Sequence, residues 1–120
     1  MPSPSESNPV NRIAPRFAFE AHIRIRLQQG DRTRLFGGWA RDISESGISA
    51  FVAQALSVGE LVTLEVPLDK STELVISAKV ARNLGTQYGF QFLALSAEQR
   101  AQIVGVTRGK AAIAVSNLSG

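Results

Sequence analysis

The sequence predicts a mainly β protein: a six-stranded antiparallel β-barrel with a C-terminal helix. Short segments in which apolar and polar residues alternate recur along most of the chain, as in strands with one buried face. Turn-forming residues separate these segments at a regular spacing. A helix-start signal follows the last segment. Closure into a barrel would leave no strand edge unpaired.

The first predicted strand covers residues 17–27, where the odd positions are apolar and most even positions are polar. Residues 29–31, Gln-Gly-Asp, are a turn signal. The returning strand is expected over residues 33–41, and the glycine pair at 37–38 permits a bulge or bend.

Four further strands are expected over residues 48–52, 61–68, 74–84 and 88–92. Pro67 indicates a strand end or an edge, because proline has no N–H to donate to a neighbouring strand. Trp39 is expected in the core, since a lone tryptophan in a small barrel is usually buried, although it is also a candidate base-stacking platform.

Ser96 and Gln99 form a capping-box pattern, so a helix is expected to begin there. Ala97, Ala101 and Val104 fall on one stripe of this helix, which would cover the barrel.

The chain is expected to form one domain over residues 12–105. Residues 1–11 are rich in Ser, Pro and Asn and predict a disordered lead-in. Residues 106–120 are rich in Ala, Ser and Gly and predict a helix end and a flexible tail.

Composition narrows the function. The chain has no cysteine, which excludes disulfides and thiolate metal sites and suits a reducing cytoplasm. His22 is the only histidine and has no neighbouring ligand types, so neither a metal site nor an enzyme is expected. No window approaches the roughly 18 consecutive apolar residues of a membrane span. Net charge is only +3, but seven of the ten arginines lie between positions 12 and 41.

Two clusters lie in or next to this arginine-rich region. Arg12 and Arg16 precede the first strand, and Asp42, Ser44 and Gly47 occupy the turn after the second. Arginine presents a planar fork that pairs with phosphate oxygens or with the O6/N7 edge of guanine. The aspartate and serine add an acceptor and a hydroxyl, so the ordered pair of clusters indicates a pocket for an anionic guanine nucleotide.

These clusters, their order and the barrel resemble the PilZ domain family over residues 12–103. The family motifs R-x-x-x-R and [D/N]-x-S-x-x-G are both complete here. The segment Tyr88-Gly-Phe-Gln-Phe92 is similar to the family's last core strand. PilZ domains are bacterial receptors for the second messenger cyclic di-GMP.

The resemblance implies that Arg12 and Arg16 grip guanine edges and phosphates, while Asp42 and Ser44 complete the site. Gly47 would let the turn adopt positive φ and admit a large planar ligand. The implied mechanism is a ligand-ordered clamp that signals to a downstream protein effector, without catalysis and with no cofactor.

Three further residues are candidate ligand contacts. Asn11 precedes the first motif, at a position that bears on whether one ligand or a stacked pair binds. Arg41 adjoins the second motif. Arg82 lies near the end of the fifth strand, where some relatives place an aromatic side chain that stacks on a base.

Alternatives remain. The chain could be a PilZ-like interaction domain that binds a protein independently of the messenger, whereas nucleic-acid binding is not expected because stacking aromatics are few. Asp42 could simply pair with Arg41 or another local arginine. Arg24 and Arg26 are read as a solvated face or as an extension of the positive field, and His22 as a surface residue.

Overall fold

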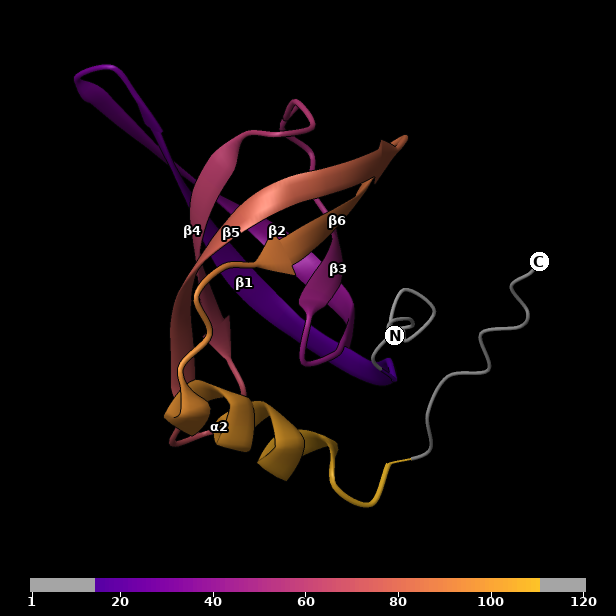
Figure 1. Cartoon of the computed structure of the whole chain (residues 1–120). Coiled ribbons are helices and arrows are strands. Elements are labelled where there is room, and N and C mark those ends of the chain that lie inside the picture. The colour runs from indigo at the N-terminus through magenta and orange to yellow at the C-terminus, as the bar shows by residue number, and fades with distance from the viewer. Residues whose placement is uncertain (1–14, 111–120) are drawn as a thin grey trace, which may run out of the picture.

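The computed structural model describes residues 15–110. Six antiparallel strands form a closed barrel in the order β1-β2-β3-β6-β5-β4 (Figure 1). Their bounds are β1 (Phe17–Gln29), β2 (Arg32–Ile43), β3 (Gly47–Phe51), β4 (Leu61–Pro67), β5 (Glu73–Leu84) and β6 (Gln87–Phe92). β4 pairs with β1 as well as with β5, which closes the ring. The predicted barrel, with all six strands and the C-terminal helix, is confirmed.

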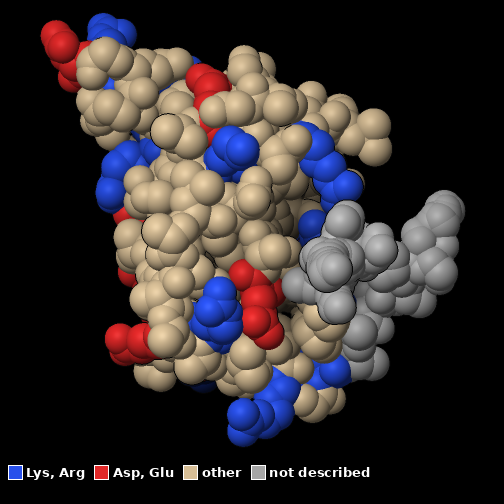
Figure 2. Space-filling model, in the orientation of Figure 1, with Lys and Arg blue, Asp and Glu red and all other residues tan. Residues whose placement is uncertain are grey.

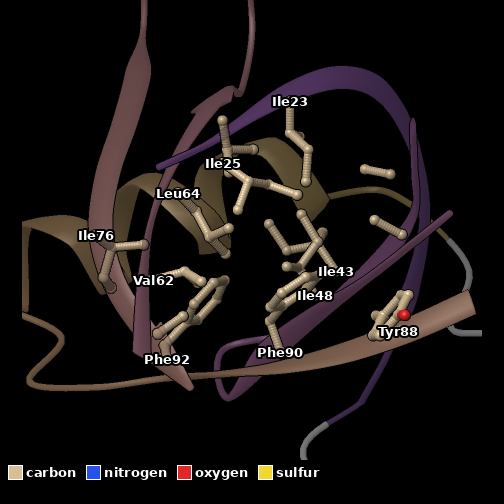
Figure 3. Packing of buried hydrophobic residues seen from close by; sticks show 14 of the residues in the cluster. Ile23, Ile25, Ile43, Ile48, Val62, Leu64, Ile76, Tyr88, Phe90 and Phe92 are labelled. Atoms are coloured by element: carbon tan, nitrogen blue, oxygen red, sulfur yellow. The ribbon is translucent and has the colours of Figure 1, made fainter. Parts of the chain in front are cut away.

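The barrel interior is filled by the apolar face of every strand. Ile23 and Ile25 of β1, Leu64 of β4 and Phe90 of β6 point toward one another inside the ring (Figure 3). Burying each such side chain contributes about 1.5–3 kcal/mol. The alternation seen in the sequence is therefore the inward and outward alternation of the strands.

The prediction that Trp39 lies in the core is wrong, because this residue is 37% exposed. Its neighbour Ala40 is the inward residue and is fully buried. A bulge between Ala40 and Asp42 then places Arg41 and Asp42 both outside the core before Ile43 turns inward. Trp39 therefore shares the outer surface with the second motif.

Helix α2 (Ala97–Thr107) lies across one end of the barrel (Figure 1). Its capping box is confirmed: the Gln99 backbone N–H donates to Ser96 Oγ and the Ser96 N–H donates to Gln99 Oε1, each at 3.0 Å. The predicted stripe is wrong, because the buried residues are Ile103 and Thr107. Gln99 Nε2 donates a hydrogen bond of 3.0 Å to the Val75 carbonyl and joins the first turn of the helix to β5, while Ile103 packs into the core.

The β1–β2 hairpin is long and projects beyond the rest of the barrel (Figure 1). Arg24 and Arg26 of β1 both pair with Glu65 of β4, the first at 3.5 Å. One carboxylate thus serves two guanidinium groups. These arginines lie on the outer face, as one of the two interpretations had it, and they also have an acidic partner on the neighbouring strand.

The predicted disordered lead-in, residues 1–11, lies outside the described residues, as do residues 111–120 of the predicted tail.

Candidate functional site

The β2–β3 turn carries the second motif and is held by Ser44. Ser44 is 2% exposed, and its backbone N–H donates to the Gly47 carbonyl at 2.8 Å. Its Oγ accepts from the backbone N–H groups of Ser46 at 3.1 Å and Gly47 at 3.2 Å. Ser44 therefore has a structural role in fixing the turn, whatever it contributes to a ligand.

Gly47 begins β3 and lies against β6, where it is in register with Gln91. A Cβ at this position would overlap the carbonyl oxygen of Phe90. The expectation of a positive φ is wrong, because the glycines that adopt one among the described residues are Gly30, Gly59, Gly85 and Gly109. Glycine is required here for a close approach between two backbones.

An ion pair joins the two motifs. Arg16 Nη1 lies 2.8 Å from Asp42 Oδ1, and the same nitrogen donates to Ser49 Oγ at 3.4 Å. Both charged side chains are partly shielded, with 26% and 18% exposed. Asp42 thus pairs with an arginine of the first motif, whereas Arg41 lies over the Phe51 ring, 5.2 Å from its centroid.

The other candidates of the first motif, Asn11 and Arg12, lie outside the described residues.

Strand register extends the site across the barrel surface. Asp42 of β2 opposes Ser49 of β3, Ser49 opposes Gly89 of β6, and Gly89 opposes Arg82 of β5. A Cβ on Gly89 would lie 3.0 Å from Cγ and Nε of Arg82, so the arginine side chain leans over this glycine. Asp42, Ser49, Gly89 and Arg82 therefore form one row across four strands. The row offers a carboxylate, a hydroxyl, a position without a side chain and a guanidinium group.

Ser49 and Gly89 were not among the predicted site residues. The signal for Ser49 is a small polar side chain at an outward position between the inward residues Ile48 and Ala50. Gly89 lies between the inward residues Tyr88 and Phe90 in the same way. Their place in the row depends on register, which the sequence pattern does not give.

Helix α2 contacts the site turn. Arg100 Nε lies 3.4 Å from Glu45 Oε1, inside the second motif. A hollow of about 340 Å³ next to the turn is lined by Ser44 and Glu45 on one side and by Thr107 and Arg108 on the other. The turn is thus in contact with the strand row and with the helix.

Charge is unevenly distributed around the row, where Arg16 and Arg82 lie with one carboxylate, that of Asp42. Over the face drawn in Figure 2, acidic and basic side chains are interspersed, and the described residues form no unbroken basic stripe there. Within residues 15–110 no group of three metal-binding side chains occurs. The row suits a compact anion with polar edges.

The sequence was compared with models of known protein families. The family model described as "PilZ domain" matches residues 11–109. The chain belongs to the PilZ domain family. PilZ domains are non-catalytic and typically bind cyclic di-GMP. A comparison with the curated proteins finds no significant match.

Solved PilZ structures share the fold at low sequence identity. The PilZ domain of CeSA from a cellulose-synthesizing bacterium is 18% identical, with a TM-score of 0.61 over 78% of this chain and 95% of that one. The PilZ domain of YcgR from Escherichia coli, solved with c-di-GMP, is 14% identical, with a TM-score of 0.62 over 95% and 98% of the two chains.

A larger relative is MrkH from K. pneumonia, solved as a complex with c-di-GMP. It is 21% identical to this PilZ chain, with a TM-score of 0.57 over 78% of this chain. The match covers 49% of MrkH, about half its length. No helix within residues 15–110 of this chain is long and apolar enough to cross a bilayer.

Proposed function

We propose that this PilZ domain is a cytoplasmic, non-enzymatic receptor for cyclic di-GMP that signals to a downstream protein effector. The observation that supports this most directly is the ion pair between Arg16 and Asp42, which brings the two motifs to one place on the barrel. Two motifs distant in sequence become one surface that offers both a donor fork and an acceptor.

Each side chain has a role matched to the ligand. Arg12 and Arg16 supply guanidinium groups to phosphate oxygens and guanine edges, with charge-assisted hydrogen bonds about twice as strong as neutral ones. The Asp42 carboxylate accepts from guanine N–H donors. Ser44 fixes the turn, and Gly47 keeps that turn seated on β6.

Arg82 and the flat surface at Gly89 extend the site toward β5. A guanidinium plane stacks on a purine base, and the missing side chain at Gly89 leaves room for that plane to lie along the sheet. Asn11 and Arg41 are the remaining candidate contacts. In this proposal Arg82 takes the place of the aromatic side chain that some relatives carry.

Signalling follows from where the site is connected. Arg16 lies next to the start of β1, and Glu45 of the site turn pairs with Arg100 of α2. A ligand that draws the arginine segment onto the turn changes the environment of Glu45, and with it the contact to α2. The segment and the helix are therefore the parts that carry the signal.

Isothermal titration calorimetry with cyclic di-GMP tests the proposal. The wild type is expected to bind, and Arg16→Ala is expected to lower affinity at least tenfold, since removing a charged hydrogen bond costs about 1.5–3 kcal/mol. Arg32→Ala is the matched control, because Arg32 lies at the far end of the β1–β2 hairpin. The same titration gives the number of ligands per chain.

Absence of heat with the wild-type protein, at concentrations where YcgR serves as a positive control, would remove the proposal. A pulldown in which an effector binds equally with and without cyclic di-GMP would instead favour the ligand-independent interaction domain.

A further inference from the structure

An exposed aromatic pair lies beside the candidate nucleotide site. Trp39 of β2 and Phe51 of β3 are in register with each other, and each is 37% exposed. The His22 ring stands edge-on to Trp39, with centroids 4.6 Å apart. These three side chains border a hollow of about 480 Å³, which is also lined by Gly37, Gly38, Val52, Ala53 and Thr86. We call this feature the Trp39 hollow.

The aromatic side chains of the Trp39 hollow lie outside the barrel core, although Val52 of that core also lines the hollow. Its two aromatic rings lie on the outer face of strands whose inner faces already fill the core with residues such as Ala40 and Ala50. Large apolar side chains at a recessed position on a surface are characteristic of binding sites. Tryptophan and arginine are also the residues most enriched where binding energy concentrates.

Arg41 and Arg24 flank the Trp39 hollow without lining it, and one exposed carboxylate, Glu20, lies two residues before His22 on β1. Arg41 places its guanidinium group over the Phe51 ring and forms no ion pair with any residue from 15 to 110. Arg24 is in register with Gly37, which lines the hollow, and shares the Glu65 carboxylate with Arg26. One carboxylate against two arginines leaves this side of the hollow positive as well.

We propose that the Trp39 hollow is the docking site for an acidic segment of a partner protein, which inserts a large apolar side chain against Trp39 and the Gly37 backbone. The hollow is large enough for a side chain as bulky as tryptophan, and the flanking arginines suit carboxylates on either side of it. Gly37 has no side chain and open space at its Cβ position, so the partner's chain can approach the strand closely there.

Other occupants fit less well. A stacked nucleobase needs an open ring face, but a guanidinium group covers Phe51 and the His22 ring stands at 89° to Trp39. A second copy of the chain docked face to face would oppose arginine to arginine. Residues 1–14 of the chain itself contain one acidic residue and no aromatic residue.

The Trp39 hollow adjoins the nucleotide site. Arg41 is the neighbour of Asp42, and Phe51 is two residues from Ser49 on the same face of β3. As the partner surface of a cyclic di-GMP receptor, the hollow rests on the proposed function. Docking itself is measurable without the nucleotide. Nucleotide binding that pulls on Asp42 also moves the residue that covers Phe51.

Labelled peptides test the docking site on the full chain. The probes are short Asp- and Glu-rich peptides with a central Leu, Phe or Trp, and the matched control peptide has Ala at the centre. Fluorescence anisotropy is expected to show saturable binding for the first group only. Trp39 is the single tryptophan of the chain, so a blue shift of its emission on binding a Leu peptide reports directly on the hollow.

Variants locate the binding. Trp39→Ala is expected to weaken peptide binding about 30-fold, the size of a typical hot-spot residue. Leu61→Ala removes an apolar side chain that is 63% exposed on β4 and is expected to change nothing. His22→Ala, which leaves the tryptophan in place, is expected to weaken binding several-fold and reduce the blue shift.

Failure of this inference is distinguishable from failure of the proposed function. Trp39→Ala that still binds cyclic di-GMP but loses the peptide supports the docking site. Peptide binding that is equal in wild type and Trp39→Ala overturns it, as does the absence of binding by every acidic peptide. A Trp39 emission shift produced by a thymidine oligonucleotide but not by the peptides overturns it in favour of nucleic acid.

Discussion

Replacing Gly47 by alanine tests whether close approach of two backbones holds the nucleotide-binding turn. The added Cβ would overlap the carbonyl oxygen of Phe90, so β3 must move away from β6. That movement strains two contacts at the turn: the hydrogen bond from the Ser44 N–H to the Gly47 carbonyl, 2.8 Å, and that from the Phe92 N–H to the Ser46 carbonyl, 2.9 Å.

The magnitude follows from these contacts. Forced overpacking costs about 1–3 kcal/mol, and each weakened hydrogen bond costs up to about 1 kcal/mol. Alanine recovers about 0.4–1 kcal/mol by restricting the unfolded chain, because φ at this position is not positive. The net loss in the free energy of unfolding is expected to be about 2–3 kcal/mol, which lowers Tm by roughly 10–20 °C.

Urea and thermal unfolding measure this loss, and Gly105→Ala is the matched control. Gly105 lies in α2 with no atom within 4 Å of an added Cβ, so the same chemical change is expected to stabilise the protein by up to about 1 kcal/mol. Surface substitutions ordinarily change the free energy of unfolding by less than about 0.5 kcal/mol. If Gly47→Ala changes it by no more than this, the close approach of β3 and β6 is not what fixes the turn.

Three further substitutions separate structure from ligand binding. Arg16→Ala is expected to cost less than about 1 kcal/mol of stability, because its pair with Asp42 is partly exposed, and to weaken cyclic di-GMP binding at least tenfold. Urea unfolding and calorimetry on the same sample measure the two effects. A large stability loss would contradict a role of Arg16 mainly in ligand binding. Ser44→Ala removes the acceptor of two backbone N–H groups and is expected to cost about 1–3 kcal/mol; an unchanged urea midpoint would show that water replaces the hydroxyl. Ser96→Ala removes the cap that accepts from the Gln99 N–H and is expected to cost about 0.5–2 kcal/mol of stability, with cyclic di-GMP affinity unchanged. Unfolding followed by circular dichroism measures the stability loss. A change in affinity would indicate that α2 supports the site more closely than its ion pair with Glu45 suggests.

Local patterns in the sequence were sufficient for most of the fold. Alternation of apolar and polar residues is a property of each strand alone, so residues 17–27 identify β1 without knowledge of its neighbours. The capping box at Ser96 and Gln99 is equally local. The two motifs are short runs of sequence, but their combination did not predict the ion pair between Arg16 and Asp42 that the structure shows.

Residues whose role depends on a bulge or on register were beyond the reach of those patterns. Trp39 faces outward in register with the exposed residues His22 of β1 and Phe51 of β3, whereas sequence alone favoured burial. Gly47 was expected to serve a positive φ, but it is needed for the distance between β3 and β6. In both cases the deciding contact comes from another strand.

The sequence by itself determined that this chain forms a six-stranded barrel with two motifs of the PilZ family, because strand periodicity, turn residues and motif spacing are local. Only the tertiary structure decided which side chains share the surface with those motifs. Ser49, Gly89 and Arg82 join Asp42 because four strands meet in one register, and Trp39 meets Phe51 for the same reason. Strand pairing between distant segments sets these neighbours, and a shift of one residue would send each side chain to the opposite face.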